Sequence, residues 1–217
     1  MKKILSDHER DQLNQLVADM ENRMDAQIVL AVVKRCDSYA ELPWKAFALG
    51  ASIAGLVFFI LNLLLLYWVS QTMLLIALLS TLSTGIVFAL LTVFMPVFAR
   101  LFLSPHRAEL EVQQYAESLF LTRELFATRN RTGILLLISS FEKQVYLLPD
   151  KGVQLTMDEK RNIIAPMTLL LKRNMVSKAM EEGLRHISII LETKAHGRSE
   201  NGRENELPNE IIEEKGV

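Results

Sequence analysis

The most informative absence in this sequence is a long stretch without charge. From Ala46 to Ala99 there is no Asp, Glu, Lys, Arg or His, although 23% of the 217 residues are charged. The hydrocarbon core of a bilayer, about 30 Å thick, needs roughly 20 apolar helical residues for each crossing. The tract is too long for one crossing and fits two joined by a tight turn. It therefore predicts a pair of transmembrane helices.

The polar residues 70–72 divide this tract, and Tyr67 and Trp68 beside them are typical of the lipid headgroup region. We expect the first span over about 46–68 and the second over about 73–98. A buried helical hairpin of a soluble protein is the alternative, but apolar residues on every helix face and no polar stripe favour lipid. The small residues of 81–85 predict close packing, either between the two spans or with another subunit.

Groups that commonly carry chemistry are also scarce. The single cysteine, Cys36, excludes an internal disulfide and lies in no CxxC motif. The 9 glycines include no GxxxxGK phosphate loop. A net charge of −1 and the lack of a basic aromatic face argue against nucleic-acid binding. The histidines are scattered without metal-ligand spacing: His8, His106, His186 and His196.

Positive charge flanks the predicted spans on one side only. Lys34, Arg35 and Lys45 precede the first span, Arg100 and Arg107 follow the second, and the connecting turn is uncharged. The positive-inside bias places such flanks in the cytoplasm. The N-terminus has no apolar region of the kind found in a cleavable signal peptide. We therefore predict a multi-pass membrane protein with both termini in the cytoplasm.

The soluble sequence before the spans predicts a helix and one buried strand. Ser6 and Glu9 have capping-box spacing and open a helix over about 7–24. The β-branched run 26–33 follows, which is typical of a strand covered on both faces. Because a lone strand is not stable, its partners must lie beyond the spans. Long insertions between sheet elements cost little loop-closure entropy.

The sequence after the spans supplies those partners. A helix starts at Ser104, with Pro105 at its first position, and strands over 133–140 and 143–149 predict a hairpin. A helix over about 156–173 contains Pro166, which is expected to kink or divide it.

A last helix covers about 175–195, and the tail is expected to be mostly disordered or loosely docked. The predicted organisation is one α/β domain split by a membrane hairpin. Its parts are the first helix and strand (1–40), the two spans (44–102), the remainder of the domain (104–196) and an acidic polar tail (197–217).

Several segments, in this order, resemble the TPM domain family: "LSDHERDQL", "AQIVLAVV", "LFATRNRTGILLLISSFEKQVYLLPDKGV", "LLLKRNMVSKAMEEGL" and the tail motif "NELPN". The resemblance covers about 5–40 and 108–210, and it is to the bacterial membrane branch, where two spans are inserted after the first strand. It implies an α/β/α sandwich with a small mixed sheet.

The resemblance also implies chemistry, because some members of the family are described as acid phosphatases that bind calcium through acidic residues. Typical members carry "DNG" before the second strand and a "GYGLE"-like loop after the third. Here Arg131 replaces the first acid, Asp150 and Gly152 are retained, and Gln154 stands where another acid would be. Since a hard cation needs several oxygen ligands, no cofactor is predicted, and calcium is kept as the alternative.

The candidate site residues follow from these loops. Asp150 is the candidate catalytic residue, because it lies at a strand end on a glycine-containing loop; a turn-forming aspartate is the alternative. Asp150, Asp158 and Glu159 are the metal candidates, although acids in a first helical turn are expected from the helix dipole alone.

Basic residues, including Arg123, are expected to gather near one end of the sheet, with ordinary solvated surface as the alternative. The candidates for an anion- or partner-binding surface are Arg129, Arg131, Lys143 and Lys151.

Together with the resemblance, these features predict an integral protein of the bacterial inner (cytoplasmic) membrane that is multi-pass and has a cytoplasmic TPM-like domain. Its expected role is that of a non-catalytic accessory or scaffold factor. The expected partners are the lipid bilayer, other membrane or envelope proteins and further copies of the chain, with no nucleic acid. The alternative is a membrane-tethered phosphatase or divalent-metal-binding domain with a reduced ligand set.

Overall fold

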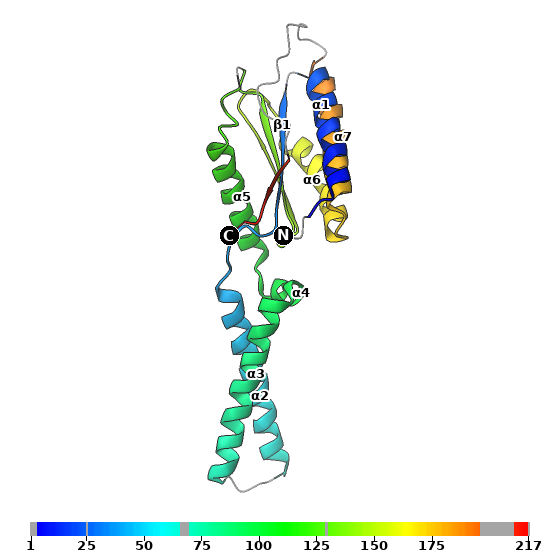
Figure 1. The fold of residues 1–217 in the computed structure, drawn as a ribbon. Coiled ribbons are helices and arrows are strands. Elements are labelled where there is room, and N and C mark those ends of the chain that lie inside the picture. The colour runs from blue at the N-terminus through cyan, green and yellow to red at the C-terminus, as the bar shows by residue number, and fades with distance from the viewer. Residues whose placement is uncertain (1–3, 25, 66–69, 129, 196–210, 217) are drawn as a thin grey trace. The chain divides into compact units, whose positions relative to one another are not determined.

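The computed structural model describes residues 4–24, 26–65, 70–128, 130–195 and 211–216. They form two compact units (Figure 1). One unit joins Met1–Asp37 to His106–Val217, and the other is Ser38–Pro105.

The first unit is built on a four-stranded mixed sheet. Its strands are β1 (Gln27–Val33), β2 (Gly133–Ser139), β3 (Gln144–Pro149) and β4 (Ile212–Glu214), in the spatial order β3-β2-β1-β4. β1 and β2 are parallel and β2 and β3 form an antiparallel hairpin. The predicted pairing of 26–33 with 133–140 across the inserted segment is therefore confirmed.

β4 was not predicted. It lies in the tail that the sequence suggested would be disordered or loosely docked, and it pairs parallel to β1 at the edge of the sheet. Residues 196–210, including the "NELPN" motif, lie outside the described part of the chain.

The helices of this unit are α1 (Asp7–Arg23), α5 (Pro105–Thr122), α6 (Met157–Lys172) and α7 (Val176–Ala195). Both predicted capping boxes are present, at the starts of α1 and α6. Pro166 does not divide α6, which continues through it.

Each face of the sheet packs against helices, as Figure 1 shows for α5 on one side and α1, α6 and α7 on the other. Leu136 belongs to the core on the side of α1, α6 and α7, and Leu135 to the core on the α5 side. Alternate residues of a strand point to opposite faces, so the apolar run of β2 is buried on both. This burial accounts for the continuous hydrophobic pattern in the sequence.

The second unit is a helical hairpin of α2 (Glu41–Leu65) and α3 (Gln71–Phe94), followed by α4 (Pro96–Ala99) and the 3₁₀ turn η1 (Arg100–Phe102). α2 and α3 are long and apolar enough to cross a membrane, and only 6% of the most apolar window of each is buried.

The second long helix ends four residues before residue 98, the approximate end that the sequence predicted for the second span. α3 ends at Phe94 because Met95 leaves the helical conformation, with φ −119° and ψ 94°. The residue before a proline is disfavoured in the helical region, and Pro96 follows. α2 begins at Glu41, before the predicted start, and residues 66–69 of the first span lie outside the described residues.

Two glycines let α2 and α3 approach closely. A Cβ added to Gly50 would lie 2.8 Å from Cγ of Phe88, and one added to Gly85 would lie 2.7 Å from Cε2 of Phe47. Each helix thus places a phenylalanine against a glycine of the other. Of the two alternatives for 81–85, Gly85 packs against the other helix of the same chain.

Candidate functional site

Asp150 lies at the amino ends of the parallel strands. Its N–H donates to the carbonyl of Gly133, the first residue of β2, at 2.8 Å. β3 runs antiparallel to β2, so the end of β3 meets the beginning of β2 and β1. Ligand sites of open α/β sheets lie at the carboxyl ends of the parallel strands. The reason for selecting Asp150 from the sequence therefore does not apply.

The carboxylate of Asp150 is occupied by Arg131. Nε and Nη2 of Arg131 donate to Oδ2 and Oδ1, each at 3.0 Å, and the Lys151 N–H donates to Oδ1 at 2.7 Å. The side chain of Asp150 is 4% exposed and that of Arg131 is 49% exposed. The guanidinium also lies 6.0 Å from the ring centroid of Phe126. A buried aspartate is thus neutralised by a cation from the chain itself.

The pKa of Asp150 follows from these contacts. Burial raises it, but the hydrogen bonds from Arg131 and the Lys151 N–H and the positive charges of both residues outweigh burial and lower the pKa. The group is ionised at neutral pH, and three of about four acceptor positions of the carboxylate are used. This arrangement leaves little capacity for proton transfer or metal coordination.

The residues do not fit a calcium ion. Calcium takes about 6–8 oxygen ligands, whereas the carboxylate of Asp150 binds Arg131. Glu159 accepts from the Thr156 N–H and from Lys194 Nζ, both at 2.7 Å, and Asp158 is exposed. Within the described residues there is no group of three or more His, Cys, Asp and Glu side chains that could hold a metal.

The basic candidates do not form one cluster. Arg131 and Lys151 lie together around Asp150. Lys143 is in the β2–β3 turn, at the opposite end of that hairpin, where its Nζ donates to Oδ1 of Asn174 at 2.7 Å. Arg129 lies outside the described residues. Arg123 binds a different carboxylate, that of Glu214.

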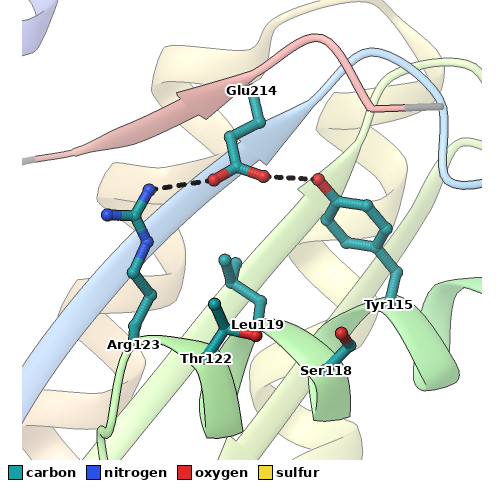
Figure 2. A pocket seen from close by; sticks show the side chains of 6 residues that line it. All are labelled: Tyr115, Ser118, Leu119, Thr122, Arg123 and Glu214. Atoms are coloured by element: carbon teal, nitrogen blue, oxygen red, sulfur yellow. Dashed lines mark hydrogen bonds and ion pairs between the residues drawn. The ribbon is translucent and has the colours of Figure 1, made fainter.

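That carboxylate borders a hollow between α5 and β4, which Figure 2 shows with Glu214 between Arg123 and Tyr115. The Tyr115 hydroxyl donates to Oε2 at 2.6 Å, and Arg123 Nη2 donates to Oε1 at 3.0 Å. The hollow has a volume of about 290 Å³. Its lining residues are Tyr115, Ser118, Leu119, Thr122, Arg123 and Glu214.

The neighbouring acid of β4 is held on the other face of the sheet. Oε1 of Glu213 accepts from the Ile4 N–H at 2.6 Å, and Oε2 accepts from Arg10 Nη2 at 2.5 Å. The two glutamates point apart because side chains alternate along a strand. The sequence analysis missed both, and the available signal was the pair of isoleucines, 211 and 212, in an otherwise polar tail.

The pairing of Glu214 makes the attachment of β4 dependent on pH. The hydrogen bond from Tyr115 lowers the pKa of Glu214, partial burial raises it, and Arg123 lowers it, so the folded pKa is below the ordinary value. Such a carboxyl stabilises the folded state above its unfolded pKa, and this contribution is lost as the pH falls through the folded pKa. We expect the attachment of β4 to be strongest at neutral pH and to weaken in acid.

Hydrogen exchange at the Lys34 amide measures this attachment, because that N–H donates to the Glu214 carbonyl at 3.3 Å. Its protection factor should decrease in acid. In Glu214→Gln the protection should be low already at neutral pH and change little on acidification. Equal acid dependence in both proteins would contradict the assignment to Glu214.

The carboxyl ends of β1 and β2 hold a buried carboxylate, Glu142. It accepts from the Cys36 N–H at 2.9 Å and from the hydroxyl of Ser139. Burial, followed by the charge of Glu142, raises the pKa of the Cys36 thiol to about 12. A thiol with so high a pKa is a poor nucleophile at neutral pH, so Cys36 has a packing role.

Comparison with known proteins gives a likeness of fold. No family model matches the chain, and no curated protein matches it. A solved structure, the NMR structure of the BA42 protein from the psychrophilic bacterium Bizionia argentinensis, is similar to it, with a TM-score of 0.55. The match covers 98% of this chain and 97% of that chain at 13% sequence identity. The similarity shows a TPM-domain-like fold and nothing about activity.

Proposed function

We propose that the chain is an integral membrane protein whose soluble unit is a TPM-like α/β/α sandwich that acts by binding other envelope proteins. In this role it is an accessory or scaffold factor and not a catalyst. The observation that carries the proposal is the Arg131–Asp150 pair. The candidate acid, Asp150, already accepts three hydrogen bonds, two of them from a guanidinium of the same chain.

The membrane assignment is supported by the helices of the second unit. α2 and α3 have the length and composition of spans, and two antiparallel spans return the chain to the side it left. Positive residues, including Lys45 and Arg100, lie near the start of α2 and after the end of α3, away from the turn that connects the two helices. They favour a cytoplasmic location for the soluble unit. We accordingly place both termini in the cytoplasm of a bacterium, at the inner membrane.

We expect the purified full chain in detergent to hydrolyse a generic chromogenic phosphomonoester no faster than the detergent background, with or without calcium. Calcium should also leave the thermal unfolding midpoint unchanged. A ligand at 100 times its dissociation constant would stabilise the folded state by about 2.7 kcal/mol, so a bound ion would be detected. Asp150→Asn is the control and should behave as the unsubstituted chain in the hydrolysis assay.

Two results would contradict the scaffold proposal. Calcium-dependent turnover that is abolished by Asp150→Asn would replace the scaffold proposal by the alternative, a membrane-tethered phosphatase. Calcium-induced stabilisation without turnover would indicate a divalent-metal-binding domain.

A further inference from the structure

The edge of β1 is covered by a short strand from the other end of the chain. β4 pairs only three of its residues with β1, placing Ile212, Glu213 and Glu214 opposite Ala31, Val32 and Val33. An uncovered strand edge presents unpaired N–H and C=O groups that template another strand. β4 therefore satisfies an edge that would otherwise accept an extended segment.

The side chains of residues 211–214 alternate between the two faces of the sheet and contact different residues on each face. Ile211 is buried in the core on the α1 side, and Ile212 packs against the core on the α5 side. Glu213 then binds Arg10 on the first side, and Glu214 binds Arg123 and Tyr115 on the second. The edge thus selects two aliphatic residues followed by two acids.

The end of the segment is also fitted closely. Gly216 has φ +73°, and a Cβ placed on it would lie 1.7 Å from the carbonyl oxygen of Arg35. A residue with a side chain cannot adopt this conformation so near the backbone. The site therefore recognises a stretch of defined sequence and not any extended chain.

The contacts that hold β4 on its α5 side are largely exposed. Arg123 and Glu214 are 50% and 35% exposed, and exposed ion pairs contribute little to stability. The hollow next to Glu214 shows that this side chain does not fill the space between α5 and β4. On the α1 side Ile211 is buried and the Arg10 and Glu213 side chains are 24% and 9% exposed, so local opening should begin on the α5 side.

We infer that the edge of β1 between Arg10 and Arg123 is a docking site for an extended acidic segment of a partner protein, and that β4 covers it in the free chain. The inference rests on the proposed binding function and names the partner's chemistry. The partner supplies two aliphatic residues followed by two acidic ones, added parallel to β1. This is the β-augmentation mode, in which main-chain hydrogen bonds give affinity and alternate side chains give specificity.

β4 acts as a tethered competitor of that partner. A segment of the same chain competes at a high effective concentration, because its binding is intramolecular. A free partner segment must exceed this competition, so weakening β4 should raise the apparent affinity for the partner. The tail therefore determines the concentration of partner segment that is needed for binding.

The test uses the full chain in lipid nanodiscs and a fluorescent peptide with the sequence of residues 209–217. In Glu213→Lys/Glu214→Lys the tail is repelled by Arg10 and Arg123, which opens the edge and leaves the rest of the chain intact. We expect the peptide to bind this variant at least about tenfold more tightly than the unsubstituted chain, because the tethered competitor is removed. The matched probe carries Gln in place of the two glutamates that correspond to Glu213 and Glu214, and it should bind at least about tenfold more weakly.

Adding Arg123→Ala to the opened variant should also weaken its binding of the peptide that retains Glu213 and Glu214. Circular dichroism and thermal unfolding of each variant establish that it is folded. Binding that depends on both the peptide's acids and Arg123 supports the docking site. A folded, opened variant that does not bind the peptide, or that binds both peptides equally, overturns it.

A peptide that binds only by dissociating a dimer of the unsubstituted chain would assign the edge to a second copy and also overturn the inference. Loss of peptide binding refutes the docking site alone, because the assay does not measure turnover. Metal-dependent hydrolysis refutes the non-catalytic function and leaves the peptide result standing.

Discussion

Deleting residues 38–105 and joining Asp37 to His106 through a short Gly-Ser linker is expected to convert the chain into a water-soluble domain that keeps its sheet. The deleted residues form a compact unit of their own. The flanking residues are already close together, since Arg107 Nη2 donates to Asp37 Oδ2 at 3.1 Å. A short linker can therefore span the gap, and shortening a connection lowers the entropic cost of closing it.

The measurement is the distribution of the protein between membrane pellet and soluble fraction, followed by circular dichroism and cooperative thermal unfolding of the soluble material. The matched control removes residues 1–105, which deletes the same hairpin together with α1 and β1. β2 then loses its parallel partner, and we expect this second protein to aggregate or remain unfolded.

An insoluble product of the first deletion would show that the α/β unit needs the hairpin in order to fold. A folded product of the second would show that β1 is dispensable. Either result would contradict the view that one domain is completed across the inserted segment.

The main elements of that domain could be predicted because their signals are local. The β-branched run of β1, the apolar run of β2 and the capping boxes of α1 and α6 each lie within a few residues of sequence. The pairing of β1 with β2 followed from the need of a buried strand for a partner. The charge-free tract similarly located the helical hairpin, although Met95 ends α3 earlier than composition suggested.

The candidate sites were harder to predict because they depend on residues that are distant in sequence. Asp150 could be selected, but its partner Arg131 lies across the β2–β3 hairpin, and only the register of the two strands brings them together. Glu214 is 91 residues from Arg123. No periodicity in the tail indicated that its acids would meet Arg10 and Arg123. A three-residue strand is too short to produce a clear pattern.

The Arg131–Asp150 pair and the Glu213 and Glu214 contacts differ in whether a partner could replace them. The Arg131–Asp150 pair is complete within the β2–β3 hairpin and the loops that flank it, since Arg131 precedes β2 and Asp150 follows β3. The Glu213 and Glu214 contacts, in contrast, join the end of the chain to α1 and α5. A partner segment could replace the second set of contacts, together with the isoleucines beside them, and leave the β1–β2 pairing in place.

Gly85→Leu is expected to destabilise the helical hairpin by about 1–3 kcal/mol, the usual cost of overpacking a well-packed contact. The added side chain would meet the ring of Phe47, whose Cε2 lies 2.7 Å from the position of the first new carbon. Gly55→Leu is the matched control, because nothing lies within 4 Å of the corresponding position. Leucine is a better helix former than glycine by up to about 1 kcal/mol, so the control should be neutral or slightly stabilising.

The measurement is unfolding in mixed micelles by titration with SDS, monitored by tryptophan fluorescence. Trp44 contributes to this signal, and its ring centroid lies 6.3 Å from that of Phe47. The double variant Phe47→Ala/Gly85→Leu adds a second control, because it removes the ring that the new leucine would meet. It should recover part of the stability lost in Gly85→Leu, and the two substitutions should therefore be non-additive. Equal effects of leucine at positions 55 and 85, or strict additivity in the double variant, would show that the glycine–phenylalanine contacts do not hold α2 against α3.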